Sequence, residues 1–230
     1  MAIIASVSGV RGVIGTDLTP QAAVDFAAAF GSWLGGGRVV VGGDTRPSGQ
    51  MLRQAVQAGL LATGCDVIDL GIVSTPGAAL MVKRLGAAGG VVITASHNPP
   101  EYNGIKFLTC QGWAPPPESA EKIFAIHRQR AFAYKDSLHT GGYTEDDTTH
   151  ARHIEAVLGV VDVDKVRAQR FSVVLDAVNG AGSIATPVLL EKLNCRATLM
   201  NCEPTGLFPH EPEPIEKNLH SLCAKVREVG

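Results

Sequence analysis

The chain has 230 residues, of which 45% are hydrophobic, 18% are charged and 5% are aromatic. This composition is typical of a soluble α/β protein, and the length allows one large domain or one domain and part of another. The formal net charge of −2 provides no basic field for nucleic acid or an anionic membrane, and no apolar run approaches the ~18 residues of a membrane span. We therefore expect neither a nucleic-acid partner nor a membrane partner.

The first part of the chain alternates predicted helices and strands. Thr19-Pro20 is typical of a helix start, and residues 21–34 predict a helix that ends at three glycines. Further strands are predicted at 38–42, 67–70 and 90–93, and further helices from after Ser48 to about residue 63, from Thr75-Pro76 to about 86, and from 118 to about 130. This alternation predicts a three-layer α/β/α domain with a mixed, mostly parallel sheet.

A second, partial domain of similar architecture is predicted to follow. Residues 137–153 are polar and predict a linker or the cap of a connecting helix. Strands are then predicted at 171–176 and 197–200, with one helix between them and another at 215–229. We assign 1–140 to the first domain, 141–153 to a linker and 154–230 to the second domain. The last helix leads into no third strand, so we expect this domain to be incomplete and to expose apolar sheet or strand edge. Such a surface favours self-association, but the oligomeric state stays open.

Neither the cysteines nor the amino terminus indicates secretion. The cysteines are scattered, odd in number and without C-x-x-C spacing (Cys65, Cys110, Cys195, Cys202, Cys223). This pattern favours reduced, mostly buried thiols in a cytoplasm over a zinc site or a disulfide framework. The apolar residues 1–7 lack a basic start and are interrupted by Arg11, so they do not resemble a signal peptide.

The strand predicted at 90–93 ends in a polar cluster, Thr94-Ala95-Ser96-His97-Asn98-Pro99. Open α/β sheets place ligands at such strand ends. Asn103-Gly104 predicts a tight turn that returns Lys106 toward Ser96. An oxygen nucleophile beside cationic groups suits phosphoryl transfer. Each residue also has a non-catalytic interpretation. His97 would form a local hydrogen bond, Lys106 would be a solvated loop lysine, and Asn98 would shape the loop.

Arginine occurs in two glycine-containing loops. In Ser8-Gly9-Val10-Arg11-Gly12 the flanking glycines allow Arg11 to lie close to a ligand and to bind phosphate bidentately. In Gly43-Asp44-Thr45-Arg46-Pro47-Ser48 we expect Asp44 and Arg46 to pair and brace the loop. His150 and His153 have metal-compatible spacing, but a solvated linker explains them better. Residues 179–183 lack the full G-x-G-x-x-G pattern and predict helix–strand packing.

Together these motifs resemble the α-D-phosphohexomutases, a family that includes phosphoglucomutases, phosphomannomutases and phosphoglucosamine mutases. Residues 94–99 with 103–106 resemble the active-site signature of the family, and 8–12 its amino-terminal arginine loop. Residues 43–48 match another family segment, and Phe208-Pro209-His210-Glu211-Pro212-Glu213-Pro214 with Asn218-Leu219 resembles its proline-rich stretch. The matches follow the family order across nearly the whole chain.

The resemblance implies a function and a set of site residues. Ser96 would carry a phosphoryl group and give it to a hexose monophosphate, forming a hexose bisphosphate. After the sugar reorients, the other phosphate would return to Ser96, so that 1-phosphate and 6-phosphate interconvert. Arg11 and Lys106 would contact phosphate and act in acid–base steps, Asn98 would contact phosphate, and His97 would help set the site. Mg²⁺ would bind Ser96 through its phosphate, with a hexose bisphosphate as activator.

The sequence departs from the family pattern in one respect. The aspartate-rich metal loop, the sugar-recognition loop and the later phosphate-binding loop of the family do not occur in it. We therefore expect a phosphosugar mutase fragment that is inactive alone and lacks the remaining metal ligands. One alternative is a non-catalytic phosphosugar-binding or assembly module that keeps the fold. Another alternative is a serine hydrolase using Ser96 and His97. It is less favoured because the sequence lacks G-x-S-x-G and a recognisable third triad member.

Overall fold

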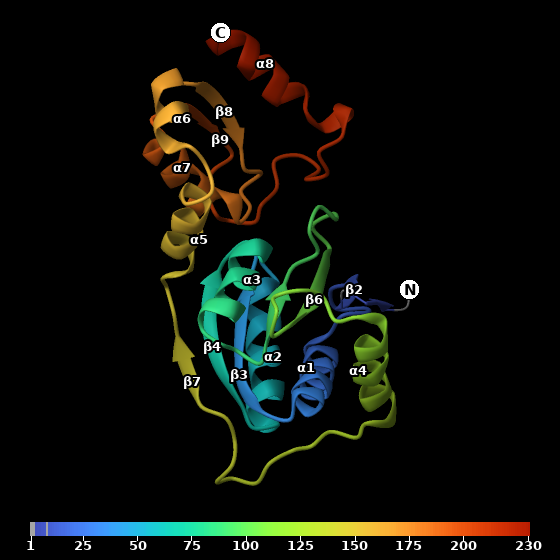
Figure 1. Cartoon of the computed structure of the whole chain (residues 1–230). Coiled ribbons are helices and arrows are strands. Elements are labelled where there is room, and N and C mark those ends of the chain that lie inside the picture. The colour runs from blue at the N-terminus through green and yellow to red at the C-terminus, as the bar shows by residue number, and fades with distance from the viewer. Residues whose placement is uncertain (1–2, 8) are drawn as a thin grey trace. The chain divides into compact units, whose positions relative to one another are not determined.

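The computed structural model of the protein describes residues 3–7 and 9–230, so Ser8 of the predicted arginine loop lies outside the described residues. The chain forms two compact units (Figure 1). The first comprises the residues up to Asp44 together with 48–95 and 101–149. The second comprises 150–230 together with two short segments, 45–47 and 96–100. The segment that contains Ser96 thus belongs to the second unit.

The first unit is built on a seven-stranded mixed sheet. Its strands are β1 (Ile4–Ser6), β2 (Gly9–Val13), β3 (Gly37–Gly43), β4 (Cys65–Ile72), β5 (Gly89–Ile93), β6 (Tyr102–Thr109) and β7 (Tyr143–Glu145), and they lie in the order β1-β2-β6-β5-β3-β4-β7. β3, β4, β5 and β7 pair in parallel, whereas β6 pairs antiparallel with both β5 and β2. Among the described strands of this sheet, only β1 and β6 therefore run against the common direction. The mostly parallel mixed sheet is confirmed.

Helices cover both faces of this sheet. They are α1 (Pro20–Leu34), α2 (Gly49–Ala62), α3 (Thr75–Arg84) and α4 (Pro117–Gln129). Val39 and Val41 of β3 share a core with α1, α2 and α4, whereas Val40 shares a second core with α3. Successive residues of a strand point to opposite faces, so a strand covered on both sides is apolar at every position. The three layers α/β/α are thus confirmed (Figure 1).

Local signals set where two of these helices begin. The hydroxyl of Thr19 accepts a hydrogen bond of 3.2 Å from the backbone N–H of Ala22, and Pro20 occupies the first turn of α1, as predicted. For α3 the prediction was wrong by one residue. The cap is Ser74, whose hydroxyl accepts from the N–H of Gly77, while Thr75 is already helical.

The second unit contains a two-stranded parallel sheet. Its elements are α5 (Thr149–Leu158), α6 (Val163–Gln169), β8 (Ser172–Asp176), α7 (Gly182–Lys192), β9 (Arg196–Met200), a short 3₁₀ helix at Glu216–Asn218 and α8 (His220–Val229). Several large apolar side chains of this unit are exposed (Val160, Phe171, Val188, Leu199, Leu207, Val226). This agrees with the expectation that the unit exposes apolar surface.

Three local predictions were wrong. The Asn103-Gly104 pair lies inside β6 and forms no turn. Within the polar segment 137–153, predicted as a linker or the cap of a connecting helix, Tyr143–Glu145 instead pairs with β4, whereas the start of α5 at Thr149 agrees with the second alternative. The thiols are free but not mostly buried: burial raises the pKa of Cys65, Cys195 and Cys202 are half-buried, and Cys110 and Cys223 are exposed.

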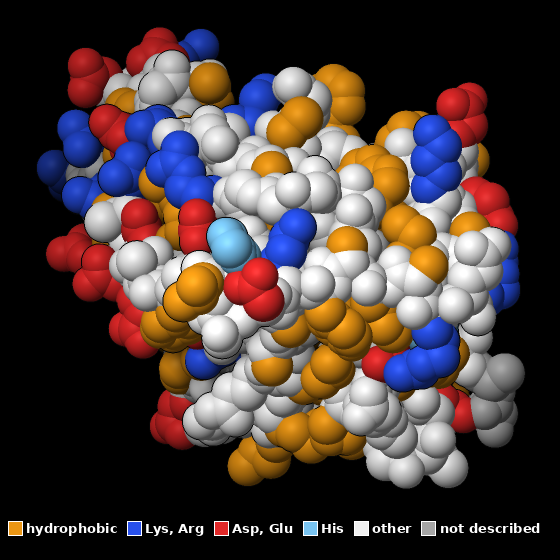
Figure 2. Space-filling model, turned by 90° about the horizontal axis from the view of Figure 1, so that it is seen from below, with side chains coloured by type: hydrophobic (Ala, Val, Ile, Leu, Met, Phe, Trp, Pro, Cys, Tyr) orange, Lys and Arg blue, Asp and Glu red, His pale blue; other side chains and the backbone are white. Residues whose placement is uncertain are grey.

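Surface charge agrees with the low net charge of the sequence. On the face drawn in Figure 2, basic side chains gather in one group at the left of the view with acidic side chains beside it, and apolar and uncharged side chains cover most of the middle. Within residues 3–7 and 9–230, each helix is too short or too polar to cross a lipid bilayer.

Candidate active site

The loop between β5 and β6 presents Ser96 to solvent. The backbone of Ser96 has a φ of 58°, the left-handed conformation that costs a residue with a Cβ about 1 kcal/mol. The side chains of Ser96 and His97 are both exposed, and Ser96 Oγ lies 3.4 Å from His97 Nδ1, at the long limit of a hydrogen bond. The prediction that a strand ends by presenting this serine and histidine is confirmed.

The buried guanidinium of Arg46 binds the backbone carbonyls of the same loop. Its Nη2 donates to the carbonyl oxygens of Ser96 at 3.0 Å and Asn98 at 2.6 Å, and its Nη1 donates to that of Pro99 at 2.8 Å. Arg46 is only 2% exposed. The sequence predicted that Arg46 pairs with Asp44 and braces its own loop, whereas these hydrogen bonds tie Arg46 to the loop that carries Ser96. Asn98 is half-buried and takes part through its backbone.

In the first unit, Asp44 and Thr94 join the ends of β3 and β5. The hydroxyl of Thr94 donates to Asp44 Oδ2 at 2.5 Å, and the backbone N–H of Asp44 donates to the carbonyl of Ile93 at 2.9 Å. The N–H of Thr94 donates in turn to the carbonyl of Gly104 in β6 at 3.0 Å. These bonds fix the backbone two residues before Ser96.

Arg11 and Lys106 lie on one face of the first unit's sheet. Arg11 of β2 pairs directly with Gly104 of β6, and residues that pair directly share a face. Lys106 follows Gly104 by two residues and therefore points to that face as well. A Cβ built on Gly104 would lie 3.6 Å from the Cβ of Arg11, so the absence of a side chain there leaves space beside the arginine. Both cations are half-buried.

Asn103 has a structural role in β6. It is fully buried, its amide donates to the hydroxyl of Ser48 at 2.9 Å, and its side-chain oxygen accepts from the N–H of Gly104 at 2.8 Å. Asn103 therefore ties β6 to the start of α2.

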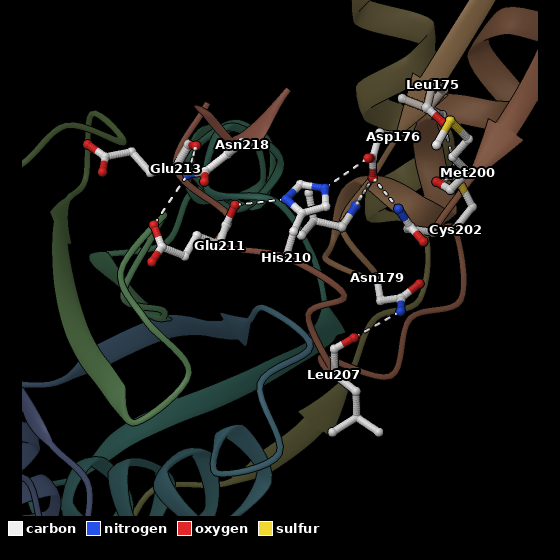
Figure 3. A network of polar contacts seen from close by, with 12 residues as sticks. Leu175, Asp176, Asn179, Met200, Cys202, Leu207, His210, Glu211, Glu213 and Asn218 are labelled. Carbon is white, nitrogen blue, oxygen red and sulfur yellow. Dashed lines mark hydrogen bonds and ion pairs between the residues drawn. The ribbon is translucent and has the colours of Figure 1, made fainter. Parts of the chain in front are cut away.

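In the second unit, the proline-rich stretch is anchored to the end of β8 by polar contacts (Figure 3). His210 lies between Asp176, whose Oδ2 is 2.9 Å from its Nε2, and the carbonyl of Glu211. Asn201 donates to the other oxygen of Asp176, and Asn179 donates to the carbonyl of Leu207. The hydrogen bond to Asp176 raises the pKa of His210. Burial alone would raise the pKa of Asp176, but hydrogen bonds from His210 and Asn201 outweigh it and lower that pKa.

The described residues offer no protein cage for a metal ion. Within 3–7 and 9–230, no group of three or more His, Cys, Asp or Glu side chains has the arrangement that would hold one.

Comparison with known proteins identifies the family. Residues 3–134 match the model of phosphoglucomutase/phosphomannomutase α/β/α domain I, and residues 151–230 match that of domain II. The chain belongs to the phosphoglucomutase/phosphomannomutase family. A "probable phosphoglucosamine mutase" of Methanopyrus kandleri is 43% identical over 96% of this chain and 48% of its own length. A phosphoglucomutase/phosphomannomutase of Thermococcus kodakarensis is 42% identical over 96% of this chain and 50% of its own length.

A solved structure of the phosphoglucomutase/phosphomannomutase family has the same fold. A family protein from Burkholderia thailandensis superposes with a TM-score of 0.84 at 30% identity, over 98% of this chain and 51% of that one. The chain spans about half the length of the curated relatives it matches. The resemblance read from the motifs is thus confirmed.

The structure groups the residues expected from the phosphoglucomutase/phosphomannomutase resemblance in two sets. Arg11 and Lys106 lie together on the first unit's sheet, whereas Ser96, His97 and Asn98 lie together in the loop assigned to the second unit. The sequence interpretation missed Arg46 as the residue that holds this loop. A buried arginine needs several acceptors, but no signal in the sequence identifies carbonyls some 50 positions away as those acceptors.

Proposed function

We propose that the chain is part of a phosphohexomutase in which Ser96 carries the phosphoryl group that is exchanged with a hexose phosphate. The observation that carries this proposal is the exposed hydroxyl of Ser96 in a left-handed, braced loop, in a chain of the phosphoglucomutase/phosphomannomutase family. Relatives are named phosphoglucosamine mutase and phosphoglucomutase/phosphomannomutase, which supports a hexose phosphate as substrate. We also propose a cytoplasmic site of action.

In the proposed reaction the phosphoserine gives its phosphoryl group to a hydroxyl of the hexose monophosphate. A new P–O bond forms to the sugar oxygen as the bond from Ser96 Oγ to phosphorus breaks. The sugar hydroxyl gives up its proton, and Ser96 Oγ takes one up. After the bisphosphate turns, the second transfer restores the phosphoserine and releases the isomeric monophosphate.

We assign supporting roles to the neighbouring polar residues. Arg11 and Lys106 present cations from one sheet face, and such cations offset charge on a transferring phosphoryl group. Lys106 is our candidate for moving the proton. His97 helps set the serine loop, and Asn98 shapes it through the carbonyl that Arg46 binds. Mg²⁺ when bound would screen phosphate charge, with Ser96 as its ligand from this chain. No step proposed here depends on it.

Phosphopeptide analysis tests the assignment of Ser96. The purified chain would be incubated with glucose 1,6-bisphosphate, digested and examined by mass spectrometry. We expect phosphate on the peptide that contains Ser96 and none after Ser96→Ala. Ser137→Ala removes another exposed serine and serves as the matched control. Unlabelled Ser96 in the wild type would contradict the proposal, as would equal labelling of the Ser96→Ala variant.

We further propose that the chain alone does not complete the mutase cycle. It spans about half the length of its relatives, and its described residues hold no metal-binding group of three side chains. Measurable conversion of glucose 1-phosphate or mannose 1-phosphate by the purified chain would refute this. The alternative of a non-catalytic phosphosugar-binding module predicts affinity for hexose phosphates without any label on Ser96. A hydrolase predicts a trapped acyl group instead, and within the described residues no carboxylate bonds to His97 as a triad would require.

A further inference from the structure

The buried guanidinium of Arg46 is surrounded by backbone oxygens of one loop. Its two terminal nitrogens donate to the carbonyls of Ser96, Asn98 and Pro99 at 2.6 to 3.0 Å. A buried charge is tolerated only when hydrogen bonds replace its lost hydration. Three neighbouring carbonyls that bind one cation must all turn inward. The side chains of Ser96 and His97 are accordingly exposed.

The conformation that results is one the loop would not adopt by itself. Ser96 has a φ of 58°, and such a φ costs about 1 kcal/mol for a residue with a Cβ and persists only where the surroundings fix it. Charge-assisted hydrogen bonds are about twice as strong as neutral ones. The bonds from Arg46 are therefore sufficient to offset the strain at Ser96.

Arg46 is itself fixed within the second unit. Its guanidinium lies 4.9 Å from the ring centroid of Phe208, in cation–π geometry. The hydroxyl of its neighbour Thr45 donates to the carbonyl of Asn179 at 2.9 Å. Gly206 lets the carbonyl of Thr45 approach, since a Cβ at that glycine would lie 2.0 Å from it. The planar guanidinium of Arg46, stacked on the ring of Phe208, is thus held in one orientation.

We propose that Arg46 is a positioning residue for phosphoryl transfer at Ser96: it acts on the serine through the loop carbonyls, and Phe208 orients its guanidinium. This inference rests on the proposed function of Ser96. Lysine cannot replace Arg46, because one ammonium cannot occupy the two separate positions from which Nη1 and Nη2 donate.

A labelling experiment with chemical rescue tests this role in the full 230-residue chain. The rate of Ser96 phosphorylation by glucose 1,6-bisphosphate would be measured by mass spectrometry for Arg46→Ala, Arg46→Lys and Phe208→Leu. We expect losses of about 10²-fold for both Arg46 variants and a smaller loss for Phe208→Leu. Added guanidinium ion should restore most of the rate of Arg46→Ala, which a merely structural effect on folding would not allow. Arg128→Ala, at an exposed arginine, is the control and should label at the wild-type rate.

A second readout separates this proposal from the function on which it rests. In chains labelled with ¹³C and ¹⁵N at serine, the carbon shifts of Ser96 report its left-handed backbone without any substrate. We expect these shifts to move toward loop-average values in Arg46→Ala and to return with guanidinium. An unlabelled wild type would refute the proposed function, while the shifts would still decide whether Arg46 positions the loop. Unchanged shifts and labelling in Arg46→Ala would overturn the inference. If Arg46→Ala does not fold, the same carbon shifts and labelling rates are measured in Arg46→Lys, which keeps the charge and the apolar part of the side chain. Unchanged shifts and labelling in that variant would likewise overturn the inference.

Discussion

His210 Nε2 lies 2.9 Å from Oδ2 of Asp176, a carboxylate whose side chain is only 5% exposed. The pair joins the proline-rich stretch to the end of β8 (Figure 3). Its hydrogen bond raises the pKa of His210. The stability that protonated His210 contributes is therefore complete below the ordinary histidine pKa of about 6.5 and is lost as the pH rises through the higher folded value. Asp176 has a lowered pKa, so its contribution is lost only in acid, below its ordinary pKa of about 3.9.

We predict that the second unit loses stability as the pH rises above about 6.5, by less than about 1.4 kcal/mol per pH unit, and that His210→Gln removes this slope. Urea unfolding at several pH values would measure it. Trp33 and Trp113 both lie in the first unit, so a change in circular dichroism without a change in tryptophan fluorescence reports the second. Asp176→Asn should remove the same slope, and a wild-type slope in His210→Gln would contradict the assignment.

Gly206 and Gly71 provide a matched pair of substitutions. Both have a left-handed backbone, with φ of 69° and 67°, but a Cβ at Gly206 would lie 2.0 Å from the carbonyl oxygen of Thr45, whereas Gly71 has open space. We predict that Gly71→Ala costs about 1 kcal/mol of unfolding free energy from backbone strain, and that Gly206→Ala costs about 2–4 kcal/mol because overpacking is added. Urea unfolding of both variants is the measurement, and equal losses would argue against the close approach.

Replacement of Ser96 separates its backbone from its hydroxyl. Both Ser96→Ala and Ser96→Gly remove the oxygen and should abolish phosphate labelling. Glycine adopts the left-handed conformation without steric cost, so we predict that Ser96→Gly is more stable than Ser96→Ala by up to about 1 kcal/mol. Thermal unfolding of the two variants decides this. A Ser96→Ala variant that is clearly the more stable of the two would indicate that Ser96 is not held at a φ of 58°.

Much of the first unit could be predicted from the sequence because its signals are local. Helix α1 has a cap, a proline in the first turn and a glycine stop, and the central strands are continuous apolar runs. Strand β6 was missed because Asn103-Gly104 is the usual signal for a hairpin turn. Here Asn103 is instead buried and bonded to Ser48, a contact between residues 55 positions apart. Local patterns carry no information about such a partner.

In the candidate site, too, residues with local sequence signals could be predicted and residues that depend on long-range contacts could not. Ser96, His97 and Lys106 could be named because unusual residue types are gathered in a short motif. The roles of Arg46 and Thr94 depend on long-range contacts, with loop carbonyls in one case and with Asp44 in the other. Tyr143–Glu145 was likewise taken for linker, since a three-residue strand of polar residues has no apolar periodicity.

That short strand supplies a final prediction. The phenol of Tyr143 donates to Asp69 at 3.2 Å and to Glu145 at 3.0 Å. Desolvation and these carboxylates raise the pKa of Tyr143 to about 12, so it stays a neutral donor over the physiological range. Buried Asp69 also accepts from Gln57 at 2.7 Å and faces Arg53. Tyr143→Phe leaves Asp69 with these partners and should cost less than about 1 kcal/mol of unfolding free energy.

Asp69→Ala is the contrasting variant. It leaves the buried amide of Gln57 and the half-buried Arg53 without their acceptor, so we predict a loss of about 2–4 kcal/mol. Tryptophan fluorescence in urea would measure both variants, because Trp33 and Trp113 report the first unit. Amide hydrogen exchange should also speed up at 143–145 in Tyr143→Phe, because β7 pairs with a single neighbouring strand, β4. A larger loss in Tyr143→Phe than in Asp69→Ala would mean that β7, and not the buried carboxylate, holds this edge of the sheet.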